Sequence, residues 1–183
     1  MKVACHFFSL FGFKLLFWRG REMKNKKMIM TLSMNAMVAA VYVALTWMIQ
    51  PLAYRELQFR ISEVIVLLAF YNKKLIPGLI VGCFISNIPS PLGIIDMLVG
   101  TFSTVVVCYC MNKVNSLYLG ALLGSIVTGV IIGGELAVIY KIPFLINAFY
   151  VFVGEAVVLF IGTAVFKKLE KNERFMEYIH TKI

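Results

Sequence analysis

The chain has few charged residues and few residues that bind metals. Only 15% of its 183 residues are Asp, Glu, Lys or Arg, and it has two histidines and four cysteines. No CxxC spacing occurs, and His6 and His180 lie at opposite ends of the chain, so no metal site is predicted. P-loop, HExxH and GxSxG patterns are also missing, which weakens any interpretation based on ATP hydrolysis or common hydrolase chemistry. We expect a protein that is not an enzyme and needs no cofactor.

Apolar residues are abundant instead. The hydrophobic fraction is 61% and the mean hydropathy is +0.87, far from the soluble average. A membrane-spanning helix needs about 20 residues, so the chain has room for one bundle and no additional soluble domain. We predict an all-α integral membrane protein with six transmembrane helices. The predicted spans are Thr31–Gln50, Ile61–Asn72, Leu75–Ile88, Leu92–Met111, Leu117–Tyr140 and Ile142–Phe166.

The placement of the basic residues predicts the orientation of the bundle. The net charge is +9, but it gathers at the termini and in alternate loops, which favours a membrane topology signal over nucleic-acid binding. With six spans, 15 of the 18 Lys and Arg residues fall on one side, and only Arg55, Arg60 and Lys141 fall on the other. Both termini are therefore predicted to be cytoplasmic. The second and third spans are short enough to be re-entrant, but Lys73 and Lys74 between them favour two crossings.

The first 22 residues are expected to lie outside the main membrane domain, residues 23–183. Val3 to Trp18 is largely apolar, yet it lacks the basic start and the cleavage site of a signal peptide. An interfacial helix and an upstream start codon are the two interpretations, and Met23, followed by basic residues, favours the second.

Four carboxylates lie inside or at the rim of the apolar stretches: Glu63, Asp96, Glu135 and Glu155. A carboxylate at the centre of a bilayer costs roughly 2.5 to 3.5 kcal/mol, so such groups usually face a protein interior and meet a partner or a ligand. With the predicted topology, all four belong to the outer side or the middle of the membrane. We therefore predict a solute pocket that opens to the exterior.

Three of these acids also have a structural explanation. Glu63 follows Arg60 by three residues and is placed to pair with it on one helix face. Asp96 lies in the first turns of a span, where the helix dipole favours a negative charge. Glu135 is near enough to the interface to reach water or Lys141.

Glu155 is the strongest candidate for a functional role, because its span offers no cation within two turns. Asn147 and Tyr150 precede it at spacings that indicate roughly the same side of the helix, and Gly154 permits close backbone approach. An acidic pocket should prefer a cation, or a neutral molecule with adjacent N–H donors such as a guanine-like edge. Aromatic residues near the outer ends either stack on a flat ring or belong to the interfacial belt: Tyr54, Phe59, Tyr140, Phe144 and Tyr150.

A stripe of small side chains follows one side of the first span: Ser33, Ala36, Ala40 and Ala44. Small residues at this spacing allow close helix contact. The spacing alone leaves open whether the partner helix belongs to the same chain or to another subunit. Internal packing is the expected explanation for the similar spacing of Gly78, Gly82 and Ser86 and of Gly120, Gly124 and Thr128.

From about Met23 to Lys168 the chain resembles the substrate-capturing membrane subunits of energy-coupling factor (ECF) transporters, and within them the QueT-type queuosine-precursor group. Four segments carry the resemblance: LQFRISE at Leu57–Glu63, PLGIIDMLVGT at Pro91–Thr101, GGELA at Gly133–Ala137 and PFLINAFYVFVGE at Pro143–Glu155. The resemblance implies a six-helix bundle in a bacterial plasma membrane. It binds its solute on the outer side and releases it after toppling, driven by a transmembrane scaffold subunit and two ATPases.

The same resemblance implies a solute and a docking surface. The solute would be a 7-deazaguanine, namely 7-aminomethyl-7-deazaguanine, its nitrile relative or queuine. Ala36, Ala40 and Ala44 would contact the scaffold. We predict Glu155 and Glu135 as the principal solute contacts, and the further candidates are Asp96, Asn147, Asn87, Arg60, Glu63 and Tyr150. Two alternatives remain open: a stand-alone proton-coupled carrier in which Glu155 titrates, and a small membrane enzyme with paired carboxylates.

Overall fold

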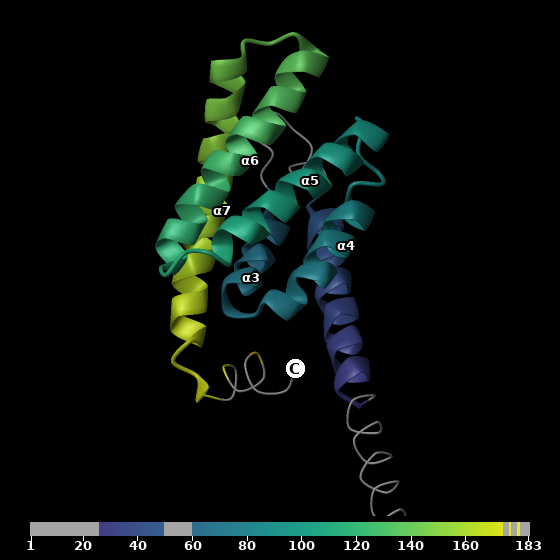
Figure 1. Cartoon of the computed structure of the whole chain (residues 1–183). Coiled ribbons are helices and arrows are strands. Elements are labelled where there is room, and N and C mark those ends of the chain that lie inside the picture. Colours follow the sequence, from purple (N-terminus) through teal and green to yellow (C-terminus); the bar gives the residue numbers. More distant parts are fainter. Residues whose placement is uncertain (1–25, 50–59, 174–175, 177–178, 180–183) are drawn as a thin grey trace, which may run out of the picture.

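The structure is a computed structural model that describes residues 26–49, 60–173, 176 and 179. The described part is helical throughout, and no strand occurs in it (Figure 1). The predicted extension 1–22 and the aromatic residues Tyr54 and Phe59 lie outside the described residues. The elements are a first helix Lys26–Met48, the 3₁₀ helix η1 Ile61–Leu67, α3 Leu68–Tyr71, the 3₁₀ helix η2 Lys73–Leu75, α4 Ile76–Ser86, α5 Ile94–Met111, α6 Leu117–Tyr140 and α7 Phe144–Leu169.

Within the described ranges, four helices are long and apolar enough to cross a membrane: the first helix, α5, α6 and α7. This confirms the predicted all-helical membrane protein. The second and third predicted spans are helical but short. Because a 3₁₀ helix rises about 2.0 Å per residue and an α-helix about 1.5 Å, η1 with α3 covers about 20 Å and α4 about 16 Å, against a hydrocarbon core of about 30 Å. Six full crossings therefore remain a prediction.

Local sequence signals explain where the shorter elements begin. Pro77 occupies the first turn of α4, where a missing N–H does no harm. Gly93, which directly precedes α5, has a φ of +60°, a backbone conformation that residues with a Cβ rarely adopt. Pro143 directly precedes α7 and sets its start two residues later than the predicted span.

Glycines bring the helices into close contact. A Cβ on Gly133 of α6 would lie 2.5 Å from the Ala148 Cα atom of α7, so these two backbones touch directly. On α4, a Cβ on Gly78 would lie 2.6 Å from the Asn35 carbonyl oxygen of the first helix, and one on Gly82 would meet the Tyr42 side chain. The small residues of α4 thus pack internally, as predicted.

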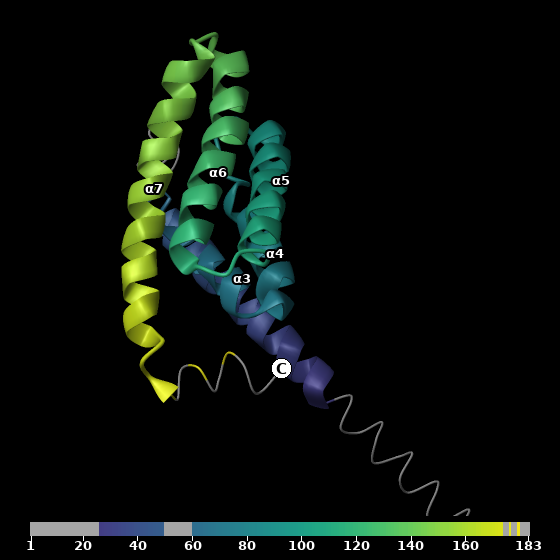
Figure 2. The ribbon, with the colours of Figure 1, turned by 60° about the vertical axis from the view of Figure 1, so that its left-hand side comes forward.

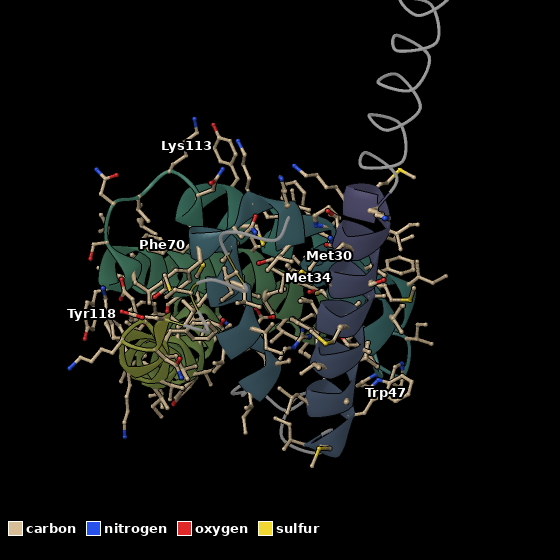
Figure 3. The ribbon with its side chains drawn as sticks, turned by 90° about the horizontal axis from the view of Figure 1, so that it is seen from below. Met30, Met34, Trp47, Phe70, Lys113 and Tyr118 are labelled. Carbon is tan, nitrogen blue, oxygen red and sulfur yellow. The ribbon has the colours of Figure 1, made fainter. Side chains whose placement is uncertain are left out.

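The first helix crosses the group formed by α5, α6 and α7 at a large angle. Helices α5, α6 and α7 lie side by side, and α6 packs most extensively on α7 (Figure 2). The first helix is strongly inclined to this group: Figure 3 shows α7 nearly end-on while the first helix lies across the view, with Met30 and Met34 on the side that faces the rest of the chain. The first helix begins, and α7 ends, at the end of the bundle opposite the turn between α6 and α7 (Figure 1).

Candidate solute-binding chamber

Arg60 is the central cation of the candidate site. It directly precedes η1 and is 5% exposed. Its Nη2 group donates to both carboxylate oxygens of Asp96, 3.2 Å from Oδ1 and 3.4 Å from Oδ2. Asp96, in the first turn of α5, also accepts a hydrogen bond from the Ser90 hydroxyl. The ion pair of Arg60 therefore runs to Asp96 on another helix and not along the helix to Glu63.

Glu63 is held by the first helix. Its Oε1 atom accepts a hydrogen bond of 2.5 Å from the hydroxyl of Tyr42, whose side chain is fully buried. One turn further along the first helix, the Thr46 hydroxyl donates to the Ser62 hydroxyl at 2.7 Å. Two side-chain hydrogen bonds thus attach η1 to the first helix.

A narrow cavity, called the Arg60 chamber here, lies between η1, α5, α6 and α7. The space within it that a water-sized sphere can enter is about 10 Å³, close to the minimum for one water molecule. Among the described residues that line it, Arg60 alone is cationic. The lining residues are Arg60, Glu63, Gly100, Ser103, Thr104, Val107, Thr128, Ile132 and Glu155.

Glu155 reaches the chamber from the middle of α7. It is 3% exposed, and in the part of the chain that the structure describes no group forms a hydrogen bond or ion pair with its carboxylate. A buried charge without a partner is costly. Glu155 and Glu63 face a guanidinium that already holds Asp96, so the chamber has more acidic than basic groups and suits a ligand that donates hydrogen bonds or carries a positive charge.

Glu135 is the second carboxylate that the fold leaves unsatisfied. It lies three residues after Ile132 on α6, which places it about one turn beyond the chamber on a similar face of the helix. It is 8% exposed, and neither carboxylate oxygen has a hydrogen-bond partner among the described residues. Of the four buried acids, Glu135 and Glu155 are thus the two that the described residues leave free for a ligand.

Asn87 lies beside the ion pair, at the end of α4. Its Nδ2 group approaches the Asp96 carbonyl oxygen at 3.5 Å, while its buried Oδ1 atom has no partner in the described part of the chain. A Cβ on Gly100 would come within 2.7 Å of Nδ2, so the glycine makes room for this amide. Asn87 therefore supports the ion pair and offers one further acceptor.

Two predicted contacts lie elsewhere. Tyr150 is 49% exposed on the outside of α7, and the structure does not bring it to the chamber. Asn147 is buried, but its Nδ2 group donates to the Gly133 carbonyl oxygen at 3.2 Å and joins α7 to α6. Tyr140 and Phe144 are also exposed, in agreement with an interfacial or lipid-facing position.

The sequence analysis missed Tyr42, Ser103, Thr104 and Thr128 as residues of the site or its support. Each is a polar side chain in an apolar span, which is a usable signal. The signal is weak because a helical hydroxyl can bond to its own backbone, as Thr104 does with the Gly100 carbonyl oxygen at 3.1 Å. In the described ranges no group of three or more His, Cys, Asp or Glu side chains is arranged to hold a metal ion.

The alanine stripe lies on the outside of the described bundle. Ala36, Ala40 and Ala44 are all exposed, whereas Tyr42 and Thr46 of the same helix are buried. The stripe therefore does not pack against the described part of its own chain. Only 17% of the apolar window of the first helix is buried, against 33–39% for the other three long helices.

Comparison with known proteins gives the family. Residues 32–171 match the family described as QueT transporter. A relative from Lactococcus lactis subsp. cremoris (strain MG1363), the queuosine precursor transporter QueT, is 33% identical over 153 residues, which cover 75% of this chain and 90% of the relative. No solved structure matches the chain. The match over most of its length shows that the chain belongs to the QueT transporter family.

Proposed function

We propose that this chain is the substrate-capturing subunit of an ECF importer in a bacterial plasma membrane, and that its solute is a queuosine precursor of the 7-deazaguanine type. Membership of the QueT family makes it a transporter and not an enzyme. The observation that carries the choice of solute is the buried Glu155 carboxylate, which has no hydrogen-bond or ion-pair partner among the described residues and lines the chamber that also holds Arg60.

The chamber suits the hydrogen-bonding edge of a deazaguanine. That edge has two adjacent donors, N1–H and the 2-amino group, beside one acceptor, the O6 atom. A carboxylate such as Glu155 accepts from both donors at once, and a guanidinium such as Arg60 donates to the carbonyl oxygen. The hydroxyls of Ser103, Thr104 and Thr128 complete a polar lining.

Glu135 supports an aminomethyl group in preference to a nitrile. An ammonium group binds strongly to a buried carboxylate that lacks other partners, whereas a nitrile has no donor to offer it. We assign the guanine edge to Glu155 and the aminomethyl end to Glu135. The implied solute is 7-aminomethyl-7-deazaguanine.

Binding requires the chamber walls to move. A bicyclic base is far larger than the water-sized space of about 10 Å³. The short 3₁₀ helix η1 bears Glu63 and follows Arg60, so its displacement widens the chamber most directly.

Energy and release are assigned to separate subunits. The exposed stripe of Ala36, Ala40 and Ala44 lets another helix approach closely, and we propose the scaffold subunit as its partner. Two ATPases attached to that scaffold would supply the energy for uptake of the solute from the extracellular side.

Calorimetry on the purified chain tests the solute. We expect saturable binding of 7-aminomethyl-7-deazaguanine and weaker binding of 7-cyano-7-deazaguanine, queuine and guanine. The absence of heat with every deazapurine would contradict the proposal.

The proton-coupled carrier is the second candidate, because Glu135 and Glu155, two buried carboxylates without a hydrogen-bond partner among the described residues, are suited to carry protons. Liposomes that contain this chain alone distinguish the two functions. We expect no accumulation of 7-aminomethyl-7-deazaguanine under a pH gradient without scaffold and ATPases. Uptake under those conditions would establish the carrier.

A further inference from the structure

The first helix has two functional faces that lie back to back. At about 100° per residue, Tyr42 is about 200° around the helix from Ala40, at the centre of the opposite side. The face with Ala36, Ala40 and Ala44 is exposed, and the face with Tyr42 is buried against the chain. One rigid helix therefore joins the proposed docking surface to the wall of the Arg60 chamber.

The Tyr42–Glu63 hydrogen bond is the most direct connection between these two places. Glu63 lines the chamber, and its Oε1 atom is occupied by the Tyr42 hydroxyl at 2.5 Å. A solute that donates hydrogen bonds can approach the same carboxylate through its other oxygen, Oε2, while Tyr42 keeps Oε1 in place. Any shift of the first helix relative to η1 also moves the Glu63 carboxylate within the chamber.

The element that bears Glu63 is suited to change conformation. The helix η1 runs for seven residues in 3₁₀ geometry, although runs beyond three or four are uncommon and often mark a hinge. Conversion to an α-helix changes the rotation from about 120° to about 100° per residue and shortens the rise from about 2.0 to 1.5 Å. A modest pull through Tyr42 can therefore reorient the side chains of η1.

We propose that Tyr42 is a positioning residue that couples occupancy of the Arg60 chamber to the placement of the docking helix. This inference rests on the proposed function, because it takes the chamber as the solute site. The Tyr42 hydroxyl holds the Glu63 carboxylate where a solute contacts it, and solute binding changes the position of the first helix relative to η1. By reciprocity, a partner that displaces this helix lowers the affinity of the chamber for its solute.

Trp47 reports on this helix directly. It lies five residues beyond Tyr42 near the end of the first helix (Figure 3). Its Nε1 group donates to the Ser86 carbonyl oxygen of α4 at 3.2 Å. The chain has two tryptophans, so Trp18→Phe leaves Trp47 as the sole indole. In the full Trp18→Phe chain in lipid nanodiscs, we expect saturating 7-aminomethyl-7-deazaguanine to shift the Trp47 emission.

The additional change Tyr42→Phe removes one hydroxyl and keeps the ring. We expect calorimetry to show solute affinity weakened by about three- to tenfold, in line with the loss of one hydrogen bond. We also expect the Trp47 emission shift at saturation to fall below half of the shift in the Trp18→Phe chain. Tyr109→Phe, which removes an exposed hydroxyl on α5, should leave both quantities unchanged. Glu63→Gln removes a negative charge from the chamber, so this variant should bind the solute more weakly. It keeps an oxygen acceptor for Tyr42, so it should still show the emission shift at saturation.

The outcomes separate this inference from the proposed function. An undiminished emission shift in Tyr42→Phe overturns the coupling, as does a Trp18→Phe chain that binds the solute without any shift. If Tyr42→Phe fails to fold, Glu63→Gln decides: loss of the shift while binding persists overturns the coupling, and retention supports it. Failure of the wild-type chain to bind the solute overturns the proposed function and the coupling together.

Discussion

At the residue scale, the four buried acids differ in how far the fold itself satisfies them. Asp96 has the Arg60 guanidinium and the Ser90 hydroxyl, and Glu63 has the Tyr42 hydroxyl. Glu135 and Glu155 have no such partner in the described residues. Asp96 and Glu63 therefore explain how the chamber is held together. Glu135 and Glu155 mark where a ligand gains the most binding free energy.

Removing the charge of Asp96 should destabilise the chain strongly. Asp96→Asn removes the carboxylate that lies 3.2 Å from the buried Arg60 guanidinium, and breaking a buried pair in this way costs about 3–5 kcal/mol of unfolding free energy. Thermal unfolding in detergent measures the loss. The matched control is Glu170→Gln, which breaks the exposed pair with Lys167 and should change stability by less than about 0.5 kcal/mol. Equal effects of the two variants would show that the Arg60–Asp96 pair is not structural.

Glu135 should determine the preference for the amine. If its carboxylate meets the aminomethyl ammonium, Glu135→Gln weakens binding of 7-aminomethyl-7-deazaguanine by about 1.5–3 kcal/mol, the usual contribution of a hydrogen bond to a charged group. Binding of the 7-cyano compound should change much less, by under about 0.5 kcal/mol. Parallel calorimetric titrations measure both affinities. A similar loss for the two ligands would remove Glu135 from the aminomethyl site.

At the scale of elements, we expect the α6–α7 pair to form the rigid wall of the chamber and η1, which the first helix holds from outside the chamber, to form the wall that moves. Direct contact between backbones fixes α6 against α7 at Gly133 and Ala148. Side-chain hydrogen bonds attach η1 to the first helix instead. We therefore expect substitutions in the contact between α6 and α7 to change stability, and substitutions on the first helix to change transport.

Two neighbouring glycines test the rigid wall. Gly133→Ala places a Cβ 2.5 Å from the Ala148 Cα atom and should cost about 1–3 kcal/mol of stability through overpacking. In Gly134→Ala the nearest atom is Phe144 Cε2 at 3.6 Å, an ordinary contact, and the better helix propensity of alanine makes this change neutral or stabilising by up to about 1 kcal/mol. Thermal unfolding of the two variants in the same detergent makes the comparison. Equal melting temperatures would contradict the close contact.

Bulk on the alanine stripe should stop transport without affecting capture. Ala40→Trp fills the space that a docking helix needs, so ATP-dependent uptake in cells should be abolished while calorimetric solute binding stays within about twofold of the wild type. Val138→Trp, at another exposed position, on α6, should retain uptake. Normal uptake by Ala40→Trp would show that the stripe has no docking role.

Long periodic elements were predictable from the sequence, whereas contacts between distant segments were not. The predicted span Leu117–Tyr140 has the same bounds as α6, and α5 ends at Met111 as predicted. Within the described residues the first helix extends back to Lys26, five residues before the predicted Thr31, because it continues into Lys26 and Lys27 beyond the apolar pattern. Glu155 was identified as a buried acid, but the Arg60–Asp96 pair joins residues 36 apart, which spacing rules for one helix cannot reveal.

At the scale of the whole molecule, the proposed function assigns solute capture to this bundle and energy supply to other subunits. The chamber lies among η1, α5, α6 and α7, while the exposed stripe lies on the far face of the first helix. The described chain begins and α7 ends at the same end of the bundle, which fits the predicted topology with both termini in the cytoplasm (Figure 1). In this arrangement the isolated chain should bind its solute and should not accumulate it.

A calorimetric comparison of the wild-type chain with Glu155→Gln tests the central claim most directly. If the Glu155 carboxylate receives the guanine edge, the wild type binds 7-aminomethyl-7-deazaguanine and the variant loses about 1.5–3 kcal/mol of binding free energy, roughly 10- to 150-fold in affinity. Glu170→Gln, a surface carboxamide of the same size, should bind like the wild type. Equal affinities for the wild type and Glu155→Gln would contradict the assignment of the Arg60 chamber as the solute site.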